Sequence, residues 1–380
     1  MKIVYGAVLT GAFSILMASM VLAKDSGYLF ISSEKDSVVT VLDGKSYSVI
    51  KKIGTAKRPR HLQFNPDRTL IYAACGNGNS IDVIDVGKLE VVDRITGIED
   101  PELFDLSPDG KTMYISLEDD AALGILNLGE NAKNRGGKPD LGKTAGAEPS
   151  SGSKDDDATA KGAKDNHEEN KDIERAQDDD DAPAVPGLST IETGAEPEGV
   201  LASPDGKTVY VSSEVANLVH VVDLRAGKIK ANVKVGKRPR RFALTPDGKE
   251  LWVSNEIGGS LSIIDTTTNK VLDTIEFAPK GFRREDVTPV GVIIGKDGKT
   301  AFVPLGRANH VAVVDVPNRK VETYILVGKR AWNATFNRDE SLLFVANGLS
   351  DDVSIVNVAA RKVIKSISAG RVPHSVLIDD

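Results

Sequence analysis

The chain has 380 residues, with 55 acidic and 48 basic side chains, a formal net charge of −7 and a single cysteine, Cys75. Because one cysteine cannot form an intramolecular disulfide, burial of a core must stabilise the fold. The length suits one large all-β domain or two ordinary domains, and internal repeats decide between them.

The amino-terminal segment has the features of a secretory signal peptide. Lys2 supplies positive charge, residues 3–22 are almost entirely apolar or small, and residues 21–23 (VLA) form a small-residue cleavage site. Such a segment is removed on export. We therefore expect residues 1–23 to be cleaved, the mature protein to be periplasmic, and no membrane span to remain.

A unit of 42 residues recurs along the rest of the chain. Two markers keep this step in seven copies, except for insertions of 54 residues in the third copy and 8 in the fifth. The first marker is an aspartate or asparagine, at Asp43, Asp85, Asn127, Asp223, Asp265, Asp315 and Asn357. The second is a proline, replaced once by alanine, at Pro59, Pro101, Pro197, Pro239, Pro289, Ala331 and Pro373.

Each unit contains four short strands, because its apolar residues alternate with period two and are mostly β-branched. We name them A to D: A follows the proline, and B, C and D are segments such as LWVSN, VxVID and KVxxxI. A unit of this size with four strands matches a propeller blade. The chain starts at strand B (28–32) and ends with a lone strand A (374–378), which can complete the first blade and remove the free edge.

The sequence therefore predicts an all-β fold: a seven-bladed β-propeller of four-stranded antiparallel blades over residues 24–380, closed by the C-terminal strand joining the N-terminal blade. Residues 130–186 interrupt it between strands C and D of the third blade. This insertion is acidic and has no aromatic residue, so it is predicted to be disordered. It can act as a charged tether for a basic partner or divalent cations, or be a tolerated loop, and we favour the loop.

Antiparallel blades place all D-to-A loops and B-to-C turns on one face, here called the mouth face. If strand A lines the central channel, the residues beside each proline surround the channel opening. These residues suit a polar ligand or a patterned protein surface, or they pair with each other and connect neighbouring blades; the sequence leaves both readings open. The binding candidates are Arg58, Arg60, Glu102, Glu198, Arg238, Arg240, Trp332 and His374.

The B-to-C turns add a second set of candidates, Glu34, Glu118, Glu214 and Glu256. These carboxylates can attract a cation or a basic partner, although capping of exposed strand ends is the simpler reading. The basic KRPR segments at 57–60 and 237–240 have acidic counterparts in adjacent units, so nucleic acid binding is not expected. The histidines lack metal-ligand spacing and no catalytic motif occurs, so we predict neither a metal site nor a catalytic residue.

The repeated YVSSE, LWVSN and LFVAN strands, with VVDL, IIDTTTNKV and S-P-D-G-K segments, resemble the YVTN family of β-propellers over residues 28–380. The exported seven-repeat form is most similar to propellers associated with PQQ-dependent catabolism, although the long acidic insertion departs from them. This resemblance implies a periplasmic accessory protein linked to alcohol oxidation. Its implied partner is a quinoprotein dehydrogenase or that enzyme's electron-transfer partner, and PQQ itself is not expected to be bound.

Two function hypotheses follow. The first is a periplasmic interaction module that binds a partner or a small polar ligand on the mouth face and is not itself an enzyme. The alternative is a lactonase-like hydrolase, since related seven-bladed propellers resemble sugar-lactone hydrolases and His374 with the nearby carboxylates could activate water.

Overall fold

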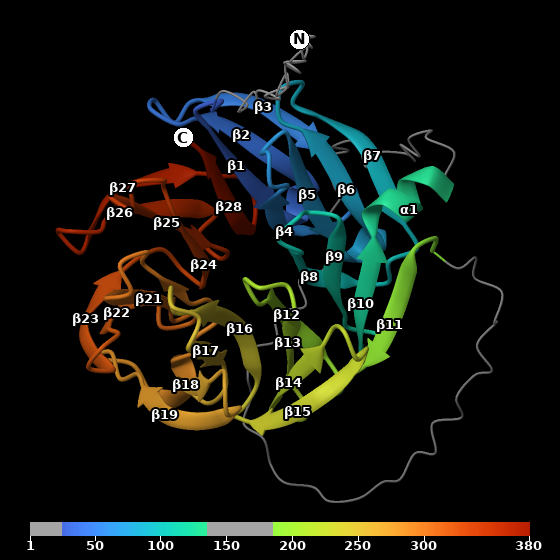
Figure 1. The fold of residues 1–380 in the computed structure, drawn as a ribbon. Coiled ribbons are helices and arrows are strands. Elements are labelled where there is room, and N and C mark those ends of the chain that lie inside the picture. The colour runs from blue at the N-terminus through green and yellow to red at the C-terminus, as the bar shows by residue number, and fades with distance from the viewer. Residues whose placement is uncertain (1–24, 135–184) are drawn as a thin grey trace, which may run out of the picture.

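The computed structural model describes residues 25–134 and 185–380, in which seven four-stranded antiparallel sheets form a ring (Figure 1). The predicted seven-bladed β-propeller is confirmed. The predicted signal peptide and most of the predicted disordered insertion lie outside the described residues. In the described ranges no helix is long and apolar enough to cross a membrane.

The first three blades follow the predicted strand order A to D. Blade 1 contains β28 (Pro373–Asp379), β1 (Tyr28–Ser33), β2 (Val38–Asp43) and β3 (Val49–Gly54). Blade 2 contains β4 (Pro59–Phe64), β5 (Leu70–Cys75), β6 (Ser80–Asp85) and β7 (Glu90–Thr96). Blade 3 contains β8 (Pro101–Leu106), β9 (Thr112–Leu117), β10 (Ala122–Asn127) and β11 (Leu188–Glu192).

The other four blades repeat this order. Blade 4 contains β12 (Pro197–Ala202), β13 (Thr208–Ser213), β14 (Leu218–Asp223) and β15 (Lys228–Lys234); blade 5 contains β16 (Pro239–Leu244), β17 (Glu250–Asn255), β18 (Ser260–Asp265) and β19 (Lys270–Glu276). Blade 6 contains β20 (Ile293–Ile294), β21 (Thr300–Pro304), β22 (His310–Asp315) and β23 (Lys320–Leu326); blade 7 contains β24 (Ala331–Phe336), β25 (Leu342–Asn347), β26 (Asp352–Asn357) and β27 (Lys362–Ser368). Short 3-10 helices occur at η1 (Glu34–Asp36), η2 (Gly76–Gly78) and η3 (Arg284–Asp286).

The ring closes where the last strand joins the first blade. Figure 1 shows β28, in red, beside β1, in blue, and the antiparallel register pairs Tyr28 with Asp379 and Ile31 with Val376. This pairing gives the backbone groups of β1 a partner on both sides. The predicted closure therefore covers the edge that β1 would otherwise expose.

The core consists of aliphatic layers between adjacent blades. In β17 the consecutive residues Leu251, Trp252 and Val253 are all fully buried, because a blade stacks against each face of the sheet. The layer between blades 6 and 7, for example, joins Phe302 and Val313 to Leu343. Stacking of whole sheets replaces the disulfides that the sequence cannot supply.

One boundary of the predicted insertion is wrong, because residues 130–134 belong to a short helix, α1 (Leu128–Asn134). The Asn131 side chain is buried and its Nδ2 donates to the carbonyl oxygen of Pro186 at 2.9 Å. Asn127 Oδ1 also accepts from the amide of Glu130 at 2.9 Å. Composition alone predicted disorder for these residues. Contact with Pro186, where the chain re-enters blade 3, gives helix α1 a packing partner.

Candidate functional site

The mouth face is built from a recurring loop that enters each strand A. In six of the seven blades, the residue before the proline, or before Ala331 in its place, has a left-handed conformation, with φ of 56° at Arg238 and 60° at Arg330. This conformation costs energy for a residue other than glycine. In the loops that enter blades 5 and 7, an asparagine of the preceding B-to-C turn accepts a hydrogen bond: the Arg238 amide donates to Asn217 Oδ1 and the Arg330 amide to Asn309 Oδ1, both at 2.9 Å. This geometry directs the neighbouring side chains to the mouth.

On the blade 1 to blade 3 side, an arginine from strand A lies between glutamates of the adjacent blades. Arg60 is buried, and its guanidinium forms ion pairs with Glu102 of β8 and, at 3.5 Å, with Glu34 of blade 1. Arg58 is partly exposed and contacts Glu102 at 3.0 Å and Asp100 at 3.2 Å. We call these five residues the first charge cluster.

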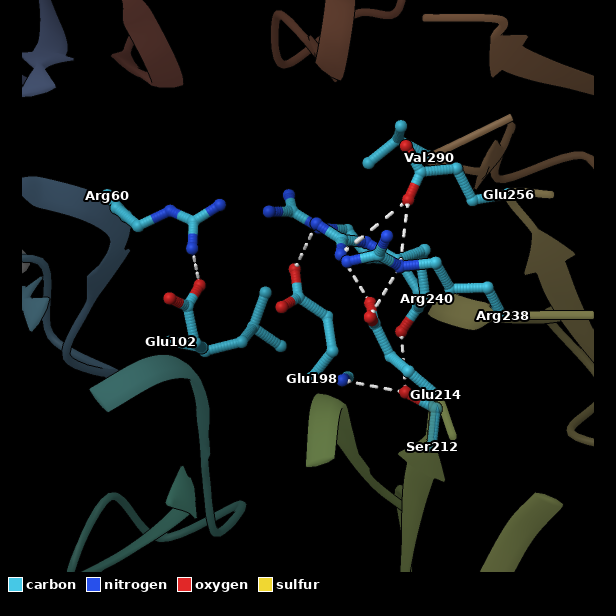
Figure 2. A network of polar contacts seen from close by, with 12 residues as sticks. Arg60, Glu102, Glu198, Ser212, Glu214, Arg238, Arg240, Glu256 and Val290 are labelled. Carbon is cyan, nitrogen blue, oxygen red and sulfur yellow. Dashed lines mark hydrogen bonds and ion pairs between the residues drawn. The ribbon is translucent and has the colours of Figure 1, made fainter. Parts of the chain in front are cut away.

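A second charge cluster lies across the channel and involves blades 4, 5 and 7. Buried Arg240 of β16 pairs with Glu198 of β12 at 2.8 Å, and also with Glu214 and Glu256. Figure 2 shows these side chains converging, with Arg60 and Glu102 facing each other at some distance from them. Arg238 pairs with Glu214 at 2.5 Å, and Arg330 reaches Glu256 at 3.5 Å.

Burial and charge perturb the ionisation of the second cluster. Burial raises the pKa of Glu214 to about 7, against the opposing effect of Arg240 and with further help from Glu198. Burial alone would lower the pKa of the Arg240 guanidinium, but Glu198, Glu256 and Glu214 hold it above its usual value. The cluster therefore combines a permanently charged arginine with a carboxyl group that titrates near neutrality.

Two of the predicted mouth residues, Trp332 and His374, pack against each other with ring centroids 5.8 Å apart. The Arg330 guanidinium lies over the Trp332 ring at 4.5 Å. His374 was predicted to lie at the channel opening, but its side chain is fully buried. Burial, together with the charges of Arg60 and Arg241, holds the pKa of His374 well below its usual value. His374 is thus neutral at neutral pH and is not an exposed rim side chain.

Glu118 lies beside the first charge cluster but forms no ion pair of its own with a described residue. Its carboxylate, with those of Asp100 and Glu102, forms a group whose oxygens lie within 4.8 Å of one another. Burial and the charges of Glu198 and Asp100 raise the pKa of Glu118. Three carboxylates by themselves do not define a cation site, and we assign none.

The structure thus brings together all the predicted residues of the mouth face, but most of their charges pair with one another. Arg60, Glu102, Glu198 and Arg240 are buried in the two clusters, as the pairing interpretation required. Ligand binding by these residues stays a prediction. The strand that faces the channel, which the sequence left open, is strand A of every blade.

Sequence reasoning overlooked Arg241, which follows Arg240 in β16 and lines the central cavity. It lies two residues after the proline, a position where strand alternation turns the side chain toward the channel axis. The corresponding residues in the other blades are Ser375, His61, Leu103, Gly199, Gly291 and Asn333. Comparing this repeat position across the blades would have identified Arg241 as its only charged residue.

Comparison with known proteins places the chain among β-propellers. A YNCE-like beta-propeller family model matches residues 4–127, and no curated protein matches the chain. Similar solved structures include the Kuenenia stuttgartiensis hydrazine synthase, with 18% identity, a TM-score of 0.67 and coverage of 88% of this chain and 93% of that one. Another is the Pseudomonas aeruginosa periplasmic gluconolactonase PpgL, with 17% identity, a TM-score of 0.66 and coverage of 93% of this chain and 99% of that one.

The dihydro-heme d1 dehydrogenase NirN is also similar, with 17% identity, a TM-score of 0.62 and coverage of 93% of this chain and 75% of that one. At such identities the likeness to these three structures shows the fold alone. The family described as lactonase, 7-bladed beta-propeller, matches residues 166–270 and 228–376, which together exceed half of the chain. The chain therefore belongs to the family of lactonase-type seven-bladed β-propellers.

Proposed function

We propose that this protein is an exported, periplasmic binding module that docks a partner protein or small polar ligand on its mouth face. The partner we propose is a quinoprotein dehydrogenase of a PQQ-dependent alcohol oxidation system, or that enzyme's electron-transfer partner. The observation that carries the proposal is a set of exposed apolar side chains at the B-to-C turns of blades 4, 5 and 7: Val215, Ile257 and Leu349 are 59%, 59% and 68% exposed.

Charge on the same face is divided by sector, which favours one docking orientation. The loops and turns of blades 3 and 4 present Glu99, Asp100, Glu118 and Glu196, whereas those of blades 5 and 7 present Lys237, Arg238, Lys329 and Arg330. Exposed apolar anchors beside sectors of opposite charge suit a protein surface with the complementary pattern. The buried ion pairs beneath hold this surface rigid, which lowers the entropic cost of binding.

The test uses the exposed apolar residues rather than the buried arginines, because an alanine at Arg60 or Arg240 would leave buried carboxylates unpaired. We expect Ile257→Asp with Leu349→Asp to weaken binding of the purified dehydrogenase or its cytochrome by about tenfold or more. A matched control is Val49→Asp with Leu272→Asp, since these residues are 57% and 46% exposed on outer strands. Equal affinities for both double variants in calorimetric titration would refute the proposal.

Lactone hydrolysis is a second candidate function, supported by the family match and by Glu214. This carboxyl group has a pKa raised by burial to about 7, and it lines a pocket of about 280 Å³ with Asn217, Lys237 and Arg238. A carboxyl group with such a pKa can transfer protons at neutral pH. Purified protein should hydrolyse gluconolactone faster than Glu214→Gln protein does; no turnover above the spontaneous rate, with or without divalent metal, excludes this function.

A further inference from the structure

Beneath the mouth face, the A strands of all seven blades enclose a central cavity of about 290 Å³. Much of its wall is apolar and includes Phe104, Val200, Phe242 and Val292. The polar side chains in the wall include His61, Gln63, Asp105, Arg241, Asn333 and Ser375. An apolar cavity of this size with a few convergent polar groups has the character of a small-molecule site.

Arg241 is the cation in this wall, and its environment differs from that of the other buried arginines of the mouth. Arg60 and Arg240 each pair with at least two carboxylates within 4 Å. Arg241 is equally buried, yet among the described residues no carboxylate lies within that distance of its guanidinium. The hydrogen bond seen for the guanidinium runs from Nη2 to His374 Nε2 at 3.1 Å, and Nε has no partner among the described residues.

The charges around Arg241 do not replace a direct partner. Glu198 and Glu34 attract it from beyond 4 Å, but they already pair with Arg240 and Arg60, which themselves repel Arg241. Asp105 lies in the same wall, but Gln63 Nε2 and the Ala202 amide donate to its two oxygens, both at 2.8 Å. Burial lowers the pKa of Arg241 to about 10, so the guanidinium stays charged at neutral pH.

A buried guanidinium without a carboxylate is costly unless an anion completes its environment. We propose that the central cavity is a binding site for a small organic carboxylate, with the carboxylate paired to Arg241 and the carbon skeleton packed against Phe104, Phe242 and Val292. The guanidinium offers two or more donors in a plane, which matches a carboxylate. The cavity volume of about 290 Å³ suits a compact ligand, and the single arginine in its wall suits one carboxylate. This site goes beyond the proposed docking function and does not depend on it.

The contact between Arg241 and His374 provides a spectroscopic reporter. Arginine only donates, so His374 Nε2 accepts and the ring proton of this neutral histidine lies on Nδ1. His374 packs against Trp332, one of only two tryptophans. A carboxylate on Arg241 competes for the guanidinium and changes the surroundings of the indole. Ligand binding should therefore alter tryptophan fluorescence.

The experiment titrates the mature full chain with benzoate and propionate beside their neutral isosteres benzamide and propionamide, followed by tryptophan fluorescence and calorimetry. We expect saturable binding of at least one carboxylate in about the millimolar range or tighter, and binding of its amide to be weaker by about tenfold or more. Arg241→Gln should lose this binding, whereas Arg241→Lys should keep part of it. Arg319→Gln is the control, because Arg319 pairs with Glu250 on the opposite face and should bind like the wild type.

Three other results would refute the proposed carboxylate site. Amides that bind as tightly as the acids, an Arg241→Gln protein that binds like the wild type, or no saturable binding of either acid would all contradict it. If Arg241→Gln does not fold, the acid and amide comparison on the wild type and the Arg241→Lys variant still decide. The Ile257→Asp, Leu349→Asp protein should bind the carboxylate normally, so loss of partner docking and loss of the cavity site are distinguishable.

Discussion

At the scale of single residues, burial decides what each charge at the mouth can do. Arg58 and Arg60 come from one KRPR segment, but the Arg58 side chain is 32% exposed and that of Arg60 is 6% exposed. An exposed ion pair contributes about 0–1 kcal/mol. Removing one partner of a buried pair costs about 3–5 kcal/mol, because the other charge is left uncompensated. Arg60 therefore joins blades, while Arg58 remains accessible to a partner.

Glu214 provides a prediction at this scale. Its folded pKa of about 7 lies above its ordinary value of 4.5, so between these values the folded state binds the proton more tightly than the unfolded state does. The stabilisation from this proton is complete below the ordinary pKa and is lost as pH rises through the folded pKa. We expect the free energy of unfolding of the wild type, relative to Glu214→Gln, to fall from about pH 5 to about pH 8.

Urea denaturation at several pH values measures this difference. Glu322→Gln on the outer strand β23 is the control and should follow the wild-type pH profile, because Glu322 pairs with the partly exposed Arg361. A wild-type protein that gains stability over Glu214→Gln across the same range would show that pairing with Arg240 outweighs burial.

At the scale of elements, closure of the ring depends on side chains at the end of β28 as well as on its backbone pairing. Asp379 Oδ2 accepts from both the amide and the hydroxyl of Ser26 at 2.7 Å, and Oδ1 accepts from Arg68 Nε at 2.8 Å. These bonds connect the chain ends and blade 2 to the last strand. The Asp379 carboxylate therefore helps to hold the closing strand β28 in place.

Replacing this carboxylate tests how much it contributes to the stability of the closed ring. We expect Asp379→Asn to lower the free energy of unfolding by about 1–3 kcal/mol, because charge-assisted hydrogen bonds to Ser26 and Arg68 are lost. Asp380→Asn should change it little, since the contacts that Asp380 accepts from the Arg338 amide are exposed to solvent. Thermal and chemical unfolding of both variants gives the comparison, and an unaltered Asp379→Asn protein would show that backbone pairing alone closes the ring.

At the scale of the whole molecule, the ring separates two faces. The mouth face carries the charge clusters and the exposed apolar turns, whereas the long insertion follows the C-to-D connection of blade 3 and so leaves from the opposite face. The structure holds the two ends of that connection together: Asn127 N donates to Gly187 O at 2.8 Å. All four strands of blade 3 thus lie within the described residues.

Removal of residues 135–184, with a short Gly/Ser linker joining 134 to 185, should therefore leave the unfolding temperature close to that of the wild type. Loop length changes the closure entropy only slowly, by about 0.6 kcal/mol for each doubling. Mouth-face docking should also persist, because the deleted residues start and end on the far face. Calorimetric unfolding and partner titration measure both properties; a large loss of stability would assign these residues a structural role.

Much of this architecture follows from the sequence, because repeats of fixed length with period-two strands determine the unit, the number of blades and the closing strand. The markers from Asp43 to Asn357 reproduce the observed strand C ends at Asp43, Asp85, Asn127 and onward. Local patterns also indicate that the candidate residues lie at one end of the blades, in B-to-C turns, D-to-A loops and the first residues of strand A, since antiparallel strands alternate between the two ends of a blade.

Only the tertiary structure decides which of these charges are available. Arg60, Arg240 and Arg241 look alike in the sequence, yet two pair with glutamates from other blades and the third lies in the cavity wall with a histidine from the closing strand. His374 likewise becomes neutral through burial beside arginines of blades 2 and 5. Ion pairing and desolvation depend on distances between residues far apart in the chain, and those distances exist only once the ring has closed.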